Sequence, residues 1–326
     1  MQQIILEQPG HFVQRDAPPP APGAGEALVL VRRVGVCGTD YHAFQGDQPF
    51  FNYPRILGHE LSAEVASAPA NARGIQRGDQ VAVEPYLNCG ECHACRNGKS
   101  NCCERLRVLG VHMDGGMQAM IAVPGERLHK SDRLSLDQLA LVEPLSIGAH
   151  AVERSGLRER EEVLVVGAGP IGLAVTQFAL AAGGHVRVLE INPARREFAA
   201  RFKVEILEHP DEHLADVVFD ATGNAPSMEQ SLTRVAHGGR LVFVGLVQKS
   251  VGIDDPLFHR REITLLATRN SVGDFPRIIR MIEMGQIDTA PWITHRLTLA
   301  EVPLRFPELP RETKCIKAMI EITGND

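Results

Sequence analysis

Short apolar runs alternate with helix-like segments between residues 163 and 267, and this alternation constrains the fold more than any other feature. Such alternation is typical of βαβ units, in which helices connect parallel strands. We therefore predict an α/β chain that contains a doubly wound parallel sheet. The predicted strands are Val163–Val166, Val186–Leu189, Val204–Leu207, Val217–Asp220, Leu241–Gly245 and Ile263–Ala267, and the helices between them include Pro193–Phe202 and Ala225–Val235.

A glycine motif, Gly167-x-Gly169-x-x-Gly172, follows the first of these strands and opens a helical pattern. In this context the glycines let the backbone approach a pyrophosphate, and the helix N-terminus supplies N–H donors. Glu190 ends the next strand, where a carboxylate accepts hydrogen bonds from an adenosine ribose and repels a 2′-phosphate. NAD is therefore the predicted cofactor, although Arg195 can soften the preference over NADP. The alternative is a doubly wound domain that binds no dinucleotide. We also assign Pro170, Ile171, Thr222, Gly245 and Leu246 to the cofactor site.

The uncharged run Val163–Gly184 is nearly long enough to span a bilayer, but the glycine motif interrupts it. A buried strand, a turn and a buried helix explain the run better than a membrane span. The net charge is −6, and no stripe of basic and aromatic residues suggests a nucleic-acid surface. The first residues lack the features of a signal peptide. We expect a cytoplasmic protein that binds neither membranes nor nucleic acids.

Five of the seven cysteines lie between Cys89 and Cys103. Without a secretion signal, such crowding indicates metal binding rather than a disulfide framework. Four thiolates at these short intervals can close a tetrahedron around zinc and leave no open position, which is typical of a structural site. Cys89, Cys92 and Cys95 are three of the ligands, and either Cys102 or Cys103 is the fourth. The alternative is a cluster of reduced thiols without metal.

A second set of metal ligands is spread along the first half of the chain. Cys37 offers a thiolate, His59 an imidazole and Glu143 a carboxylate. Three protein ligands leave an open position on zinc, as a catalytic site requires. The role of Glu60 remains open between a direct ligand, a ligand that exchanges with substrate, and a second-layer partner.

Thr39 and His42 follow Cys37 closely and can form a path for a proton. The Thr39 hydroxyl can hydrogen-bond an alcohol, and the His42 imidazole can pass the released proton to water. We therefore predict Thr39, His42 and Glu60 as catalytic residues.

Together these motifs resemble the zinc-dependent medium-chain alcohol dehydrogenases, in their polyol, sorbitol and threonine dehydrogenase branch. The resemblance implies a GroES-like, mostly β catalytic domain (1–152), a Rossmann domain (153–284) and a return to the catalytic domain (285–326). It also implies two zinc ions per chain, and it favours Cys103 over Cys102 as the fourth ligand of the structural zinc. The motifs that carry it are Gly35-Val-Cys-Gly-Thr-Asp40, Gly58-His-Glu60, Gly78-Asp-Gln-Val81, the four-cysteine loop, Glu143-Pro-Leu-Ser146 and the glycine motif.

The implied reaction is the reversible oxidation of a secondary alcohol to a ketone, by hydride transfer to NAD, in a homodimer or homotetramer. The substrate is a polyol, a sugar acid or a hydroxy amino acid. Two alternatives are a zinc-free quinone or enone reductase on the same scaffold and a non-enzymatic, zinc-stabilised binding or sensor protein. The aromatic residues Phe44, Phe50, Phe51 and Tyr53 either line the substrate pocket or pack in the core.

Overall fold

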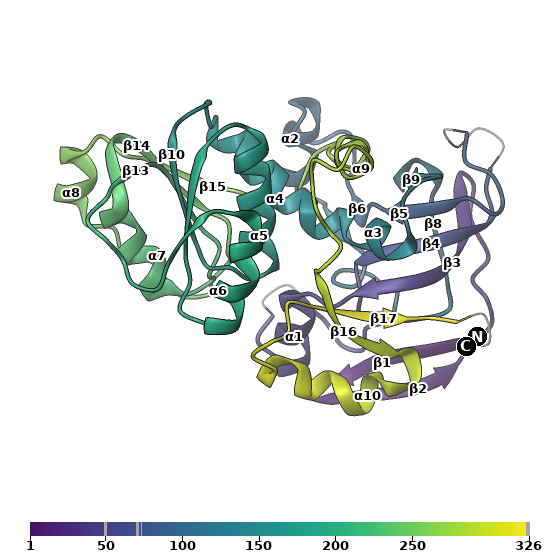
Figure 1. Ribbon diagram of the computed structural model, residues 1–326. Helices are drawn as coiled ribbons and strands as arrows, with labels where there is room; N and C mark the ends of the chain where they lie inside the picture. The colour runs from purple at the N-terminus through teal and green to yellow at the C-terminus, as the bar shows by residue number, and fades with distance from the viewer. Residues whose placement is uncertain (49–50, 70–71, 73, 324–326) are drawn as a thin grey trace. The chain divides into compact units, whose positions relative to one another are not determined.

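The computed structural model describes residues 1–48, 51–69, 72 and 74–323 (Figure 1). By its internal contacts the chain divides into two compact units. Unit 1 comprises Met1–Glu143, Phe275–Gly285 and Thr289–Asp326, and unit 2 comprises Pro144–Asp274 and Gln286–Asp288.

Unit 1 is built on a seven-stranded sheet with the order β16-β17-β3-β4-β5-β9, in which β8 also pairs with β3. The C-terminal strand β17 lies antiparallel beside β3 (Figure 1), so the end of the chain completes the sheet that the beginning starts. Buried and partly exposed residues alternate along β3, which fits a strand with one face on the core. The bounds are β3 (Glu26–Gly35), β4 (Glu60–Ser67), β5 (Gln80–Val83), β8 (Met120–Pro124), β9 (Leu128–Lys130), β16 (Ile293–Thr298) and β17 (Lys317–Glu321).

Smaller elements surround this sheet. Among the described residues, two further strand pairs and five α-helices belong to unit 1. They are β1 (Gln2–Gln8), β2 (His11–Asp16), β6 (Tyr86–Leu87), β7 (Arg107–Val108), α1 (Gly38–Gln45), α2 (His93–Arg96), α3 (Leu136–Ala140), α9 (Phe275–Glu283) and α10 (Val302–Arg305). Phe44, Phe51 and Tyr53 pack against the hydrophobic core of this unit, and Phe50 lies outside the described residues.

Unit 2 contains the predicted parallel sheet, with the strand order β12-β11-β10-β13-β14-β15. The order runs outward from β10 to β12 and then restarts at β13, so β10 and β13 flank the switch point at which such sheets bind ligands. The prediction of this sheet is confirmed, although β14 begins earlier than expected. The bounds are β10 (Glu162–Val166), β11 (His185–Leu189), β12 (Glu205–Leu207), β13 (Ala215–Asp220), β14 (Val235–Phe243), β15 (Thr264–Ala267), α4 (Val142–Ser155), α5 (Pro170–Ala181), α6 (Pro193–Ala199), α7 (Ala225–Ser231) and α8 (Asp255–Arg260).

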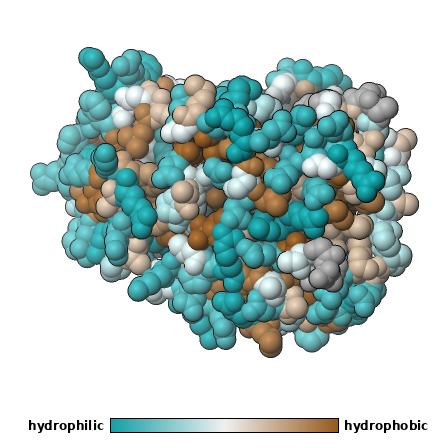
Figure 2. Space-filling view, turned by 45° about the vertical axis from the view of Figure 1, so that its right-hand side comes forward, coloured by the Kyte–Doolittle hydropathy of each residue, from teal (hydrophilic) through white to brown (hydrophobic). Residues whose placement is uncertain are grey.

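Helix α5 explains the long apolar run in the sequence. Its residues from Gly172 to Ala179 are all buried, and it packs on β10 and β11. A mostly apolar sequence is expected where most of a helix lies in a protein core. Within the described part of the chain, no helix is long and apolar enough to cross a membrane. Hydrophilic side chains dominate the face shown in Figure 2, with hydrophobic ones scattered among them.

The boundaries of the two units differ from the domain boundaries expected after residues 152 and 284. The expected boundary after residue 152 falls inside α4, whose first residues belong to unit 1. Helix α9, which was expected in the second domain, belongs to unit 1. Its apolar face is buried there, and the ring of Phe275 lies 5.1 Å from that of His129 on β9. An amphipathic pattern shows that a helix buries one face, but it does not show against which neighbour.

Candidate functional site

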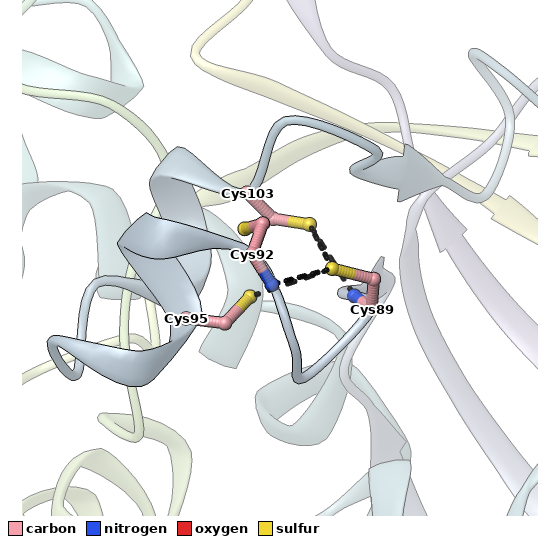
Figure 3. Close-up of side chains that lie close together, drawn as sticks. All are labelled: Cys89, Cys92, Cys95 and Cys103. Atoms are coloured by element: carbon pink, nitrogen blue, oxygen red, sulfur yellow. Dashed lines mark hydrogen bonds between the residues drawn. The ribbon is translucent and has the colours of Figure 1, made fainter.

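Four cysteines converge in unit 1, as Figure 3 shows. Cys89 follows β6, Cys92 caps the start of α2, Cys95 lies in α2, and Cys103 follows a short 3₁₀ turn. Their sulfur atoms all lie within 4.8 Å of one another. Cys102 is exposed and is not part of this group. A set of four sulfur donors in close array suits tetrahedral zinc.

The local backbone favours ionised sulfur at this cluster. The N–H groups of Glu91 and Cys92 lower the pKa of the Cys89 thiol to about 6. Burial raises the pKa of the Cys103 thiol to about 11. A bound dication favours the thiolate form of all its ligands. The cluster therefore fits zinc in both geometry and charge.

A polar chain connects the thiolate cluster to the sheet of unit 1. The side-chain amide of Asn88 donates to the Cys95 sulfur at 3.6 Å, and Arg127 donates to the Asn88 oxygen at 2.6 Å. Arg127 also donates to Glu84 at 2.7 Å, and the other Glu84 oxygen lies 2.9 Å from His129. Partners of this kind orient metal ligands and tune their basicity.

We expect the substitution Asn88→Ala to raise the rate of zinc release from the four-cysteine site by about tenfold, because it removes a donor to Cys95 and breaks the link from Cys95 to Arg127. Zinc release can be followed with a chromogenic chelator. Asn97→Ala is the matched control, since Asn97 is in the same loop but its side chain bonds only to His93 among the described residues. Equal release rates in the two variants would contradict the role given to Asn88.

A second group combines sulfur, nitrogen and oxygen donors. Ligand atoms of Cys37, His59 and Glu60 lie within 4.8 Å of one another. Cys37 caps α1, and Glu60 begins β4 directly opposite Gly35 on β3. A Cβ atom on Gly35 would lie 2.1 Å from a Glu60 carboxylate oxygen, so only glycine leaves room for this carboxylate. The mixed donor set suits zinc with an open coordination position.

A buried carboxylate, Asp40, lies next to two members of this group. Asp40 accepts a hydrogen bond from the backbone N–H of Cys37 at 2.9 Å, and its other oxygen lies 3.9 Å from Nδ1 of His59. Neither that oxygen nor Nδ1 has a hydrogen-bond partner among the described residues. Burial by itself lowers the pKa of His59, but Cys37, Asp40 and Glu143 together raise that pKa well above its usual range. The imidazole is thus held between a sulfur and a carboxylate.

Glu143, the other predicted carboxylate ligand, is near this group but not part of it. Its carboxylate accepts a hydrogen bond from the hydroxyl of Tyr86, and both side chains are buried. Burial raises the pKa of Glu143 to about 7, while the charge of His59 lowers it and that of Glu60 raises it. Among the described residues, the compact ligand group therefore contains Glu60 rather than Glu143.

The predicted proton path lies on α1. Thr39 is half-buried, and His42 is exposed with Nδ1 at 3.0 Å from Asp47. Among the described residues no hydrogen bond joins Thr39 to His42, although residues three apart share one side of a helix.

The glycine motif forms the predicted turn between β10 and α5 in unit 2. Gly169 caps α5, and Pro170 is its first residue. A Cβ atom on Gly172 would lie 1.8 Å from the carbonyl oxygen of Gly167, so the turn can close only around glycine. Ile171, in the first turn of α5, is half-buried. The loop leaves backbone N–H groups at a helix N-terminus, which suits a pyrophosphate.

Glu190 lies beside this loop, as the ribose-binding role requires, but it also holds the loop. Its carboxylate accepts hydrogen bonds from the N–H groups of Ala168 at 2.6 Å and Asn192 at 2.8 Å. Arg195 also lies near the loop, with one nitrogen 3.9 Å from the position of a Cβ atom on Gly169. Its Nε atom is buried without a hydrogen-bond partner among the described residues.

The remaining predicted cofactor residues follow β13 and β14. A Cβ atom on Gly245 would lie 2.3 Å from the backbone nitrogen of Gly223, so the loops after the two strands touch. Buried Asp220 organises both loops: its carboxylate bonds Thr222, and its carbonyl accepts from the N–H of Gly245 at 3.1 Å. Leu246, the next residue in the loop after β14, is 69% exposed.

The sequence analysis did not identify several residues that contact the predicted metal ligands. Lys317 carried the clearest signal, because a lysine interrupts the otherwise apolar run Ile316–Ile320. Its ammonium lies 2.7 Å from each carboxylate oxygen of Glu60. Asp40 was part of a quoted motif but had no role, and Tyr86 and Asn88 gave no signal at all.

Models of known protein families match the parts of the chain that contain most of these residues. The model of the alcohol dehydrogenase GroES-like domain matches residues 23–133, and that of the zinc-binding dehydrogenase matches residues 170–284. The first covers the cysteine cluster and the Cys37–His59–Glu60 group, and the second covers most of the nucleotide-binding unit.

Two curated relatives and a solved structure extend this agreement over nearly the whole chain. L-Galactonate-5-dehydrogenase of Escherichia coli K12 is 42% identical over 318 residues, 92% of this chain and 94% of the relative. 2-Dehydro-3-deoxy-L-galactonate 5-dehydrogenase of Pseudoalteromonas atlantica is 36% identical, over 92% of this chain and 93% of the relative. An alcohol dehydrogenase of E. coli CFT073, solved with NADH, has a TM-score of 0.92 at 27% identity and covers 98% of this chain and 99% of its own. The chain belongs to the zinc-dependent alcohol dehydrogenases, NAD(P)-linked enzymes with a GroES-like domain and a Rossmann domain.

Proposed function

We propose that this dehydrogenase oxidises the hydroxyl at carbon 5 of a six-carbon sugar acid, with L-galactonate as the leading candidate. The observation that carries the proposal is the 42% identity, over 92% of the chain, to an L-galactonate-5-dehydrogenase. The second relative is also a 5-dehydrogenase of a galactonate derivative. A mixed sulfur, nitrogen and carboxylate ligand set agrees with this chemistry, since a carboxylate makes zinc a harder acid for oxygen-rich substrates.

In this proposal the catalytic zinc is held by Cys37, His59 and a carboxylate, for which the compact grouping favours Glu60 over Glu143. The four-cysteine site holds a structural zinc. When bound, the catalytic zinc supplies a Lewis acid that lowers the pKa of an alcohol, and NAD(P) supplies the hydride acceptor. Asp40 orients His59, and the three protein ligands would leave one coordination position open for the alcohol oxygen.

The side chains of α1 handle that proton. Thr39 is half-buried three residues before the exposed His42, so a proton passed from the substrate to Thr39 can reach solvent through His42. The glycine loop, Glu190, Arg195 and the loops organised by Asp220 bind the cofactor. Each of these roles is part of the proposal.

A kinetic screen tests the substrate assignment. L-Galactonate, L-idonate, a six-carbon polyol and L-threonine would each be supplied with NAD⁺, and NADH formation would be measured. We expect the highest kcat/KM for an aldonate. A preference for threonine or for uncharged polyols would overturn the sugar-acid assignment. Reduction of quinones or enones by zinc-free protein would instead support the alternative zinc-free reductase.

We expect Glu190→Gln to narrow the preference for NAD⁺ over NADP⁺ by about tenfold, because the change removes a charge that repels the 2′-phosphate. The amide oxygen keeps one acceptor for the loop N–H groups of Ala168 and Asn192. Comparing kcat/KM for the two cofactors measures the effect. Glu208→Gln, an exposed carboxylate in the same unit, is the control. A wild-type protein that uses NADP⁺ as well as NAD⁺ would contradict the role of Glu190.

We also propose a homodimer or homotetramer located in the cytoplasm. The edge strand β15 supports the oligomer, because most of its residues are exposed. Its outer backbone groups can pair with the sheet edge of a second copy. The thiolate-rich zinc site supports the cytoplasmic location, since such a site needs the reduced cysteines that a reducing compartment maintains. Light scattering of the purified protein tests the oligomeric state, and a monomer would contradict it.

A further inference from the structure

A buried lysine, Lys317, donates hydrogen bonds to the carboxylate of Glu60 in the candidate catalytic group. The ammonium of Lys317 on β17 lies 2.7 Å from both carboxylate oxygens of Glu60 and 3.1 Å from the carbonyl oxygen of Val36. The two charged side chains are 2% and 1% exposed. Three acceptors match the three N–H donors of an ammonium, so the lysine is fully bonded.

Glu60 is thus in reach of two positive partners. Its ligand oxygen lies within 4.8 Å of ligand atoms of Cys37 and His59, where a metal ion would bind. The same carboxylate has both oxygens engaged by Lys317. It packs against the backbone of Gly35, which leaves it little room to turn elsewhere. A carboxylate between two cations can shift from one to the other over a short distance.

Stability alone does not explain this lysine. A buried ion pair is often no more stabilising than an apolar pair of the same volume, because both charges lose their hydration. The neighbours of Lys317 on β17 are buried apolar residues, so an apolar side chain would suit the strand. A charge at this position therefore indicates a role toward Glu60.

We propose that Lys317 is a positioning residue that competes with the metal for Glu60, and so lets this carboxylate leave the metal when a substrate hydroxyl takes its place. The inference rests on the proposed function, in which Glu60 is a ligand of the catalytic zinc. Lys317 gives the departing carboxylate a full set of hydrogen bonds and a countercharge. Without the lysine, Glu60 loses the two hydrogen bonds that its carboxylate accepts from that ammonium.

The test measures metal affinity in the absence of substrate. The weakly held zinc is removed by mild chelation, and Co²⁺ binding to the vacated site is titrated against a competing chelator. We expect Lys317→Met to bind Co²⁺ about tenfold more tightly than the unmodified protein. Lys130→Met is the matched control, because Lys130 is a partly exposed lysine on β9 of the same unit. Lys317→Gln provides a variant that keeps a hydrogen-bond donor to Glu60, should the methionine variant not fold.

A double variant separates competition from simple repulsion between the lysine and the metal. In the Glu60→Gln background, Lys317→Met should change Co²⁺ affinity by less than about threefold, because the contested carboxylate is gone. Equal gains in both backgrounds would show repulsion only and overturn the proposal. Unchanged or weaker Co²⁺ binding in both Lys317→Met and Lys317→Gln would also overturn it.

Kinetics and spectra then link the affinity to turnover. We expect Lys317→Met to lower kcat and to shift the visible spectrum of bound Co²⁺ toward that of a site with Glu60 permanently coordinated. An unchanged spectrum would overturn the proposal. If sugar acids are not the substrates, the binding results and spectra still stand, so failure of the substrate assignment is distinguishable from failure of this inference.

Discussion

The substitution Cys37→Ser is expected to lower the zinc content from two ions per chain to about one and to reduce kcat/KM by at least about 10³-fold. A Lewis acid contributes several kcal/mol of charge stabilisation in the transition state, and each 1.36 kcal/mol corresponds to a factor of ten in rate. Cys37 supplies the only sulfur of the Cys37–His59–Glu60 group. Serine is a weak zinc ligand, so the remaining imidazole and carboxylate would hold the metal poorly.

The fold is expected to survive this change, since the four-cysteine site keeps its own zinc. Metal analysis, circular dichroism and kinetics on one preparation would check all three points. Cys102→Ser is the control, because Cys102 is exposed and lies outside both ligand groups. Full activity in Cys37→Ser, or loss of zinc and activity in Cys102→Ser, would contradict the assignment of the two sites.

Much of the fold could be predicted because local patterns determine it. The apolar runs of unit 2 appear as parallel strands in the expected series, and the glycine motif forms the expected turn between β10 and α5. The four-cysteine loop could be predicted for the same reason, since its ligands lie within fifteen positions of the sequence. Short-range spacing constrains geometry strongly.

Long-range partners could not be predicted in this way. Lys317 meets Glu60 across 257 positions, and Tyr86 meets Glu143 across 57, through strands and loops that sequence patterns do not bring together. The packing of α9 on unit 1 is similar, because an amphipathic helix has no marker for its neighbour. The hydrogen bonds of Glu190 could not be predicted either. Its position after β11 predicted a ribose contact, but its bonds to Ala168 and Asn192 depend on the direction of the side chain.

Loss of the Thr39 hydroxyl is expected to have the second-largest effect on catalysis. We expect Thr39→Val to lower kcat for alcohol oxidation by about 10²-fold, within the range typical of groups that transfer protons. In the proposed path Thr39 contacts the substrate oxygen itself, so its loss leaves the alcohol proton without a first acceptor. Thr39→Ser is the matched control, because it keeps a hydroxyl at the half-buried position on α1.

His42→Gln should have a smaller effect, at or below about tenfold, because the imidazole is exposed and water can replace it. The slowing should be greatest at low pH, where hydroxide is too scarce to accept the proton. Zinc content should stay unchanged in the variants at both positions, which separates a proton path from a metal ligand. A pH–rate profile for each variant decides the matter. If His42→Gln loses zinc, or oxidises alcohol at the unmodified rate at every pH, His42 has no part in proton transfer and its contact with Asp47 is only structural.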